Sequence, residues 1–254
     1  MKYIYLCENS LEGILSCIYR AWEDSHGHSK NEIQLLEADY NRQLFCEYIE
    51  VITDKEKAEK VARTITQKIS VEFYRQIMQV SVSYNPQKAD IIYRCIILGL
   101  YMGKDVLHHL GSTSVSHLFS LSRNVTNEIH HFNGFLRFME LRNGLLFAKI
   151  RPKNDILYFL SEHFCDRFPD EDFIIADVGR NSLLLHAKGL DPIIQNRIDF
   201  DIEQLDALYS DDEQLLQNLF QTFIDAIQID SRKNPKLQQQ NLPLRFREFM
   251  NEFH

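Results

Sequence analysis

The segment GFLRFMELRNGLLFAKI, residues 134–150, marks the position at which the apolar pattern of this sequence changes from helical to extended. Upstream of Gly134, apolar residues recur every three or four positions, a spacing that places them on one face of a helix. Downstream, two apolar runs flank Asn143-Gly144, and this dipeptide is a strong signal for a two-residue hairpin turn. We therefore expect a helix that ends near Phe132, followed by two antiparallel strands.

The first expected strand, residues 135–141, carries a charged residue on an apolar face. Strand alternation places Arg137 on the same side as two apolar neighbours. A buried charge needs a partner, so two interpretations are open. Arg137 either pairs internally, with Glu140, Glu128 or a backbone carbonyl, or binds an anion on the sheet surface.

The sequence after this hairpin predicts a helix and a second hairpin. Asn154 is placed to cap a helix whose apolar stripe runs to Phe164. Two strand-like runs, 173–178 and 183–187, then flank the turn residues 179–181. The order ββαββ indicates an α+β fold, in which a helical lobe packs with an antiparallel sheet built from hairpins.

The N-terminal half predicts strands and helices in a different order. Residues 2–8 form an expected strand, and Ser10 is the expected N-cap of the helix that follows. A second strand, 46–52, precedes a long helical region, 55–110, which a capping box from Thr53 begins. We therefore expect a strand and helix lobe over residues 1–132. Residues 133–254 would hold the hairpins and the C-terminal helices, unless both parts form one compact domain.

Composition is that of an ordinary globular protein, with 44% hydrophobic and 25% charged residues. No apolar run approaches the roughly 20 residues of a membrane helix, and no apolar leader follows Met1. We expect a cytoplasmic protein without a membrane partner. Its five cysteines are dispersed, which indicates free thiols and predicts neither a bound metal nor another cofactor.

The net charge of −8 is distributed unevenly along the chain. Residues 120–153 contain six basic and two acidic side chains, and residues 231–254 contain five basic and two acidic ones. Between them, residues 154–230 contain four basic and 17 acidic side chains. Charge blocks of this kind indicate partners of opposite charge rather than a particular fold.

Motifs of nucleotide-binding proteins and hydrolases are absent, since the sequence has no GxGxxG, GxxxxGK[ST] or GxSxG. The adjacent histidine pairs 108–109 and 130–131 do not have the spacing of the HExxH zinc motif. Asp105 and His109 are four residues apart and could share a metal ion or a proton, but a single pair of this kind is a weak signal. No catalytic residue is assigned.

The C-terminal run SRKNPKLQQQN, residues 231–241, is the strongest unexplained polar stretch, and Arg245-Phe246-Arg247 follows it. Cations suit phosphates, amides suit base edges, and an aromatic ring suits base stacking. The alternative is a solvated segment whose cations neutralise the acidic helical region before it, which we expect over residues 202–229 with a break near Ser210. Pro235, Pro243 and the polar run 238–241 predict a loop, followed by a last short helix over residues 244–253. The expected nucleic-acid-binding residues of this region are Arg232, Lys233, Asn234, Lys236, Gln238, Arg245 and Arg247.

Four motifs give the sequence a resemblance to a known family over nearly its whole length. They are Ser10-Leu11-Glu12-Gly13, Phe135-Leu136-Arg137-Phe138, His163-Phe164-Cys165-Asp166-Arg167-Phe168-Pro169, and Arg232-Lys233-Asn234-Pro235 with Leu242-Pro243. They resemble the bacterial DNA metabolism proteins of a SAM-associated domain-of-unknown-function family. The resemblance implies a radical-SAM partner that acts in DNA repair or modification, and a related domain occurs fused to uracil-DNA glycosylase-like domains. The resemblance adds Arg137 and Arg167 to the expected DNA-binding residues. For Arg167 the alternative is a local ion pair with Asp166 or Asp170.

Three functions follow as expectations. The first is a DNA-binding accessory protein of a radical-SAM DNA repair or modification enzyme. The second is an acidic interaction module without nucleic-acid contact, which docks a basic partner. The third is an enzyme that acts on nucleic acid through Asp105, His109 and His131.

Overall fold

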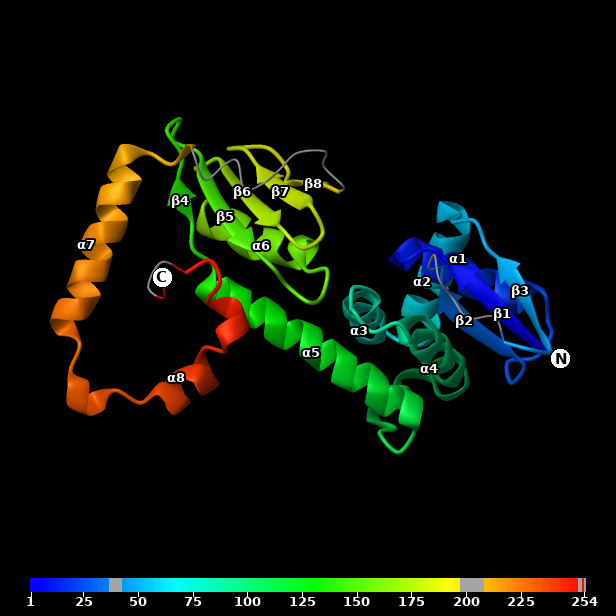
Figure 1. Ribbon diagram of the computed structural model, residues 1–254. Coiled ribbons are helices and arrows are strands. Elements are labelled where there is room, and N and C mark those ends of the chain that lie inside the picture. The colour runs from blue at the N-terminus through cyan, green and yellow to red at the C-terminus, as the bar shows by residue number, and fades with distance from the viewer. Residues whose placement is uncertain (37–42, 197–207, 251–252, 254) are drawn as a thin grey trace. The chain divides into compact units, whose positions relative to one another are not determined.

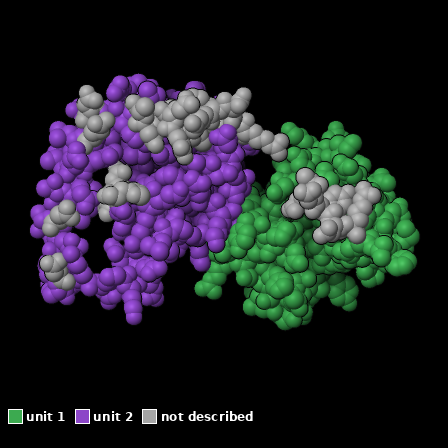
Figure 2. Space-filling view, viewed as in Figure 1, with its two compact units in different colours: residues 1–126 green, residues 127–254 purple. Residues whose placement is uncertain are grey.

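The computed structural model describes residues 1–36, 43–196, 208–250 and 253 of the chain. These residues form helices and two sheets, so the fold is an α+β mixture, as predicted. The chain divides into two compact units, unit 1 from Met1 to Thr126 and unit 2 from Asn127 to His254 (Figure 2).

Unit 1 contains a sheet of three described strands, β1 (Lys2–Cys7), β2 (Asn31–Leu35) and β3 (Cys46–Glu50) (Figure 1). The order is β2-β1-β3 and both pairings are parallel. Parallel neighbours need a crossover, which α1 (Leu11–Glu23) supplies between β1 and β2. The sequence predicted β1 and β3, but it missed β2, which has only two apolar residues.

The start of α1 explains why a glycine is required in the Ser10-Leu11-Glu12-Gly13 motif. The Ser10 hydroxyl accepts a hydrogen bond from the Gly13 amide at 3.0 Å, which confirms Ser10 as the N-cap. A Cβ atom on Gly13 would lie 2.6 Å from the Glu8 carbonyl oxygen. The loop after β1 can therefore turn tightly into α1 only over a residue without a side chain.

Gly13→Ala is accordingly expected to lower the free energy of unfolding of unit 1 by about 1–3 kcal/mol, because the clash is with backbone that cannot rotate away. Urea unfolding followed by the fluorescence of Trp22, on the same helix, measures the change. Gly111→Ala is the control, since its added Cβ would meet nothing within 4 Å. Equal midpoints for the two variants would contradict the steric explanation.

The helices of unit 1 confirm the predicted helical region. They are α2 (Lys55–Lys68), α3 (Val71–Ser81), α4 (Lys88–Met102), the 3-10 helix η1 (Gly103–His108) and the first part of α5 (Thr113–Phe135). The predicted cap of α2 was wrong by one residue. Asp54 accepts from the Lys57 amide, whereas the Thr53 hydroxyl donates to Glu8 at 2.9 Å.

Helix α5 continues through Gly134, three residues beyond the predicted end at Phe132. An exposed glycine costs a helix only roughly 0.5–1 kcal/mol, and the ring of Phe135 packs against Phe246 with centroids 5.8 Å apart. The helix therefore includes Phe135, the first residue of the predicted strand 135–141. Within that predicted strand, Met139 and Glu140 form the observed strand.

Unit 2 is built around a five-stranded sheet of described residues in the order β4-β5-β6-β7-β8. Its strands are β4 (Met139–Glu140), β5 (Leu146–Ile150), β6 (Phe173–Asp177), β7 (Ser182–His186) and β8 (Ile193–Gln195). Both predicted hairpins are present, and Gly144 has the positive φ of 82° that their first turn requires. The prediction of an entirely antiparallel sheet was wrong, because β5 and β6 are parallel. The crossover helix α6 (Leu157–Arg167) joins these two strands.

The C-terminal segment contains α7 (Asp211–Ile227), η3 (Asp230–Arg232), α8 (Pro235–Asn241) and η4 (Leu244–Phe246). Ser210 caps α7, close to the predicted break, and the predicted helical residues 202–207 lie outside the described residues. The expected loop over 238–241 is instead the end of α8. The expected last helix, 244–253, is not continuous: η4 forms its start, and residues 247–250 are not helical.

Hydrogen bonds to the β4-β5 hairpin fix the start of α7. The Ser210 amide donates to the Glu140 carbonyl at 3.0 Å, and the Arg142 amide donates to Leu208 at 2.9 Å. In return, the Glu140 amide donates to the Glu213 carboxylate at 3.1 Å. The first turn of α7 is therefore attached to the sheet edge.

Candidate nucleic-acid interface

Four of the predicted binding residues lie around one surface hollow of about 460 Å³ in unit 2. Its lining residues are Gln228, Ile229, Arg232, Lys233, Asn234, Pro235, Leu237, Gln238 and Asn241. All residues from Ser231 to Asn241 are exposed, including the fifth predicted residue, Lys236. The cluster, which we call the α8 surface, thus combines cations with side-chain amides.

Local capping chemistry sets the shape of the α8 surface. Asn234 Oδ1 accepts from the Leu237 amide at 3.1 Å, and Pro235 occupies the first turn, where its missing N–H costs nothing. This cap uses one lone pair of Asn234 Oδ1, and the side-chain NH2 group is the donor that Asn234 offers to a ligand. Among the described side chains, neither Arg232 nor Lys236 forms an ion pair.

Arg245 lies elsewhere in unit 2, in an ion pair with a buried carboxylate. Its Nη1 atom is 2.7 Å from Oε1 of Glu128, a residue that is 1% exposed. Glu128 also accepts from the Lys153 amide at 3.1 Å, the Asn154 amide at 2.8 Å and the Asn154 side chain at 2.7 Å. The prediction that Asn154 caps α6 was wrong. Asn154 instead supplies two of the hydrogen-bond donors to Glu128.

The ring of Phe246 is buried and not available for stacking on a base. It lies among three rings of α5, with centroid distances of 4.9 Å to His131, 5.0 Å to Phe132 and 5.8 Å to Phe135. The Arg245 guanidinium covers it at 4.3 Å. Together, Arg245 and Phe246 attach the C-terminal segment to α5.

His131 provides a pH test of this attachment. Burial, followed by the neighbouring His130 and Arg245, lowers the pKa of His131 below its usual value. The unfolded chain then binds a proton at this site more readily than the folded one, so stability is lost as pH falls through and below about 6.5. Urea midpoints from far-UV circular dichroism should fall between pH 7.5 and 5.5, and less steeply in His131→Gln. The exposed His108→Gln is the control; the same pH dependence in both variants would contradict this account.

The remaining predicted arginines do not join the α8 surface through any described contact. Arg137 donates to the carbonyls of Gly134 at 3.2 Å and Leu136 at 3.4 Å, which supports internal pairing with backbone carbonyls. Arg167 is exposed at the end of α6, 5.5 Å from the ring of Phe168. Arg247 donates to the Leu242 carbonyl and lies 4.4 Å from the Phe253 ring.

A second buried carboxylate, which the sequence analysis missed, lies at the β6-β7 turn. Asp177 is fully buried, and it accepts from Nη1 of Arg180 at 2.8 Å and from the amides of Gly179 and Arg180. Burial raises the pKa of Asp177, although the Arg180 guanidinium opposes the shift. Arg180 also donates to the carbonyls of Pro152 and Lys153.

The loop 152–154 is thus held on two sides. Glu128 accepts from its N–H groups, and Arg180 donates to its carbonyl groups. One sequence signal could have revealed Glu128, since it lies three residues after Val125 and four before Phe132, within the apolar stripe of α5. Both carboxylates accept several hydrogen bonds, an arrangement that stabilises the folded structure.

The three residues of the third expected function belong to different units. Asp105 and His109 are exposed in unit 1, whereas His131 belongs to unit 2 and packs against Phe135 and Phe246. Within the described ranges there is no group of three His, Cys, Asp or Glu residues that could hold a metal ion. Across the same ranges, no helix is both long and apolar enough to cross a membrane.

Comparison with known proteins identifies the family but no activity. No functionally curated protein matches the sequence. A crystal structure of an uncharacterized protein from Helicobacter pylori G27 aligns over 82% of this chain and 99% of its own at 9% identity, but its TM-score of 0.23 is too low to carry an argument. The domain of unknown function DUF4130 matches residues 86–252, more than half of the sequence, and this chain therefore belongs to the DUF4130 family.

Proposed function

We propose that this protein is a DNA-binding accessory factor that works beside a radical-SAM enzyme of DNA repair or modification. The α8 surface is the observation that carries the proposal, because it gathers Arg232, Lys233 and Gln238 around one exposed hollow. Guanidinium and ammonium groups contact phosphates, and side-chain amides reach sugars or base edges. The radical-SAM partner is inferred from the family resemblance of the sequence.

The composition of the α8 surface limits the kind of binding. None of the residues that line the hollow is aromatic, so bases would not be held there by stacking. Three cations, Arg232, Lys233 and Lys236, could make about three phosphate contacts, fewer than the roughly six to ten of a tight DNA binder. Binding would be weak and tolerant of sequence, which suits an accessory protein that gains affinity through its partner.

Fluorescence anisotropy with labelled duplex and single-stranded DNA, over a series of salt concentrations, tests the proposal. Each lost phosphate contact removes about 0.9 from the slope of log K against log salt on duplex DNA, so Arg232→Ala/Lys236→Ala should reduce the slope by about 1.8. The control with the same charge change is Lys55→Ala/Lys104→Ala, at two exposed positions of unit 1. No binding at low salt, or an equal loss in both double variants, would refute direct DNA contact.

A second candidate function, protein docking without nucleic-acid contact, is favoured by α7. Six large apolar side chains of this helix are between 47% and 58% exposed: Leu215, Leu216, Leu219, Phe220, Phe223 and Ile227. Their spacing of three and four residues forms one stripe, the pattern of a helix that binds in an apolar groove.

Charge identifies the kind of partner that would cover this stripe. α7 contains four acidic residues and no basic one, three of the acidic residues at its start and Asp225 near its end. Pairing with α7 of a second copy, parallel or antiparallel, would bring like charges together at a cost. A partner groove with Lys and Arg at its rim is therefore favoured.

Co-purification with the radical-SAM partner tests the docking function. Leu219→Asp and Phe223→Asp should abolish the complex and leave the folding of the isolated protein unchanged, because both side chains are exposed. Asn218→Asp adds the same charge away from the stripe and should have no effect. Retention of the complex by both stripe variants would exclude α7 as the contact.

A further inference from the structure

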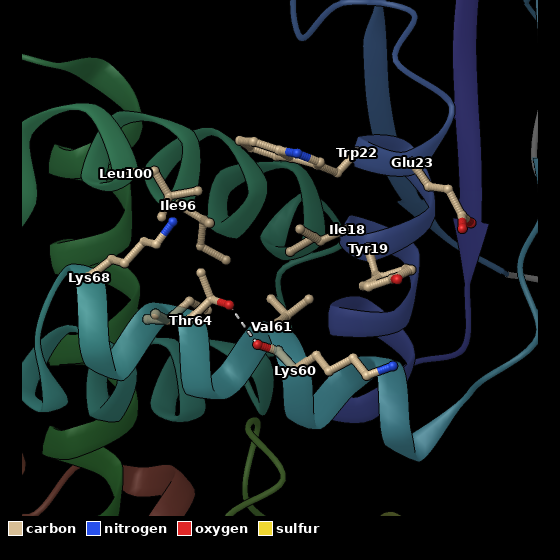
Figure 3. Close-up of a pocket in the computed structure, with 11 residues that line it drawn as sticks. Ile18, Tyr19, Trp22, Glu23, Lys60, Val61, Thr64, Lys68, Ile96 and Leu100 are labelled. Carbon is tan, nitrogen blue, oxygen red and sulfur yellow. Dashed lines mark hydrogen bonds between the residues drawn. The ribbon is translucent and has the colours of Figure 1, made fainter.

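A separate apolar pocket of about 520 Å³ lies in unit 1, between α1, α2 and α4 (Figure 3). Its residues are Ile18, Tyr19, Trp22 and Glu23 of α1, Lys60, Val61, Thr64, Ile65 and Lys68 of α2, and Ile96 and Leu100 of α4. Its volume falls within the roughly 300–1,000 Å³ of small-molecule sites. The pocket contains none of the residues of the α8 surface or of α7.

The floor of the pocket is made of buried apolar side chains. Ile18, Ile65 and Ile96 are at most 3% exposed, so they form a packed base. Trp22 is 48% exposed and forms part of the wall. An apolar or aromatic ligand body would cover this ring and remove its surface from water, at about 25 cal/mol per Å² of apolar area.

The rim of the pocket is cationic. In Figure 3 the Lys68 ammonium extends from α2 toward Ile96 and Leu100, beside the apolar floor. Among the described residues, neither Lys60 nor Lys68 forms an ion pair. Glu23, the acidic residue of the rim, already has two cationic neighbours, Lys57 at 3.8 Å and Arg20 at 3.9 Å.

We propose that this pocket binds a small organic acid that has an apolar body and one anionic head. The body lies on the isoleucine floor against Trp22, and the head lies at Lys68, with Lys60 adding to the positive field. An apolar floor requires an apolar ligand, and unpaired cations at the rim select an anion over a neutral or cationic head.

The sequence provides its own reporter of binding, because Trp22 is the single tryptophan of the chain. Three probes with the same ten-carbon tail, decanoate, decanol and decyltrimethylammonium, are titrated below their micelle concentrations. We expect decanoate to shift the Trp22 emission to shorter wavelength and to bind at least several-fold more tightly than the other two. Equal affinity for all three probes, or no change in emission, would overturn the proposal.

Charge reversal at the rim sharpens the test. Lys68→Glu should weaken decanoate binding about five- to tenfold, since it replaces an attraction near a surface by a repulsion, and should strengthen decyltrimethylammonium binding. Lys55→Glu, on the same helix but outside the pocket, should change neither. If the two variants behave alike, Lys68 does not hold the head.

A partner protein is the other class of occupant, and the same reporter distinguishes it. A synthetic acidic amphipathic helix is titrated against Trp22 alongside decanoate. If the peptide shifts the emission and decanoate does not, the pocket is a protein-docking groove and the small-acid proposal fails. Binding of decanoate that Lys68→Glu weakens supports it, whatever the outcome for DNA binding.

Discussion

Glu128→Ala is expected to lower the free energy of unfolding of unit 2 by about 3–5 kcal/mol, which is a large share of the stability of a typical domain. The substitution removes the acceptor of four hydrogen bonds at once. Two of the abandoned donors belong to Asn154, which is fully buried and cannot turn to water. Buried donors without a partner cost about 1–3 kcal/mol each. Urea unfolding followed by far-UV circular dichroism measures the loss.

Two comparisons separate the buried network from the loss of a charge. Glu162→Ala removes an exposed carboxylate from α6 and should change stability by less than about 0.5 kcal/mol. Arg245→Ala should cost less than Glu128→Ala, because the other three donors to Glu128 remain. The double variant Glu128→Ala/Arg245→Ala should fall short of the sum of the single effects, since the two residues share one ion pair. A cost below about 1 kcal/mol for Glu128→Ala would show that the loop 152–154 is held by other means.

Phe246→Ala is expected to cost about 3–5 kcal/mol and to release the C-terminal segment from α5. The side chain is 5% exposed and contacts three rings, so its removal leaves a cavity that the aromatic groups cannot fill. Proteolysis at low enzyme concentration should then cleave after α8 at least ten times faster than in the wild type. Unfolding measured by circular dichroism gives the equilibrium cost.

Phe220→Ala is the matched control, since it makes the same chemical change on the exposed stripe of α7. It should leave both the unfolding midpoint and the cleavage rate of the C-terminal segment close to their wild-type values. If Phe246→Ala has as small an effect as Phe220→Ala, the C-terminal segment is not anchored by its aromatic contacts, and Arg245 alone must attach it.

Local chemistry decided which parts of the fold could be predicted. Asn143-Gly144 specifies its turn through the backbone conformation of glycine, and Ser10 caps α1 through a hydrogen bond three residues away. Both were confirmed. The parallel pairing of β5 with β6 was missed because hairpin signals say which strands are adjacent in sequence, but not how a helix such as α6 returns the chain to the sheet.

The site shows the same division between local and distant contacts. The run of cations and amides at 231–241 predicted an exposed polar segment, because exposure of such a segment follows from its composition. The roles of Arg245 and Phe246 depend on Glu128 and His131, which are more than 100 residues away, so no local pattern distinguished a docked residue from a free one. Asn234-Pro235 is a clear signal for a helix start, and it is the start of α8. The polar, glutamine-rich residues after it were instead predicted to form a loop.

The two-sided hold on the loop 152–154 has a consequence for hydrogen exchange. Loop amides ordinarily exchange quickly with solvent deuterium, yet those of Lys153 and Asn154 donate to a carboxylate that is 1% exposed. These amides can exchange only when their hydrogen bonds to Glu128 break, so their protection from exchange should approach that of the central strands. A short stretch without regular secondary structure would thus be among the slowest-exchanging parts of unit 2.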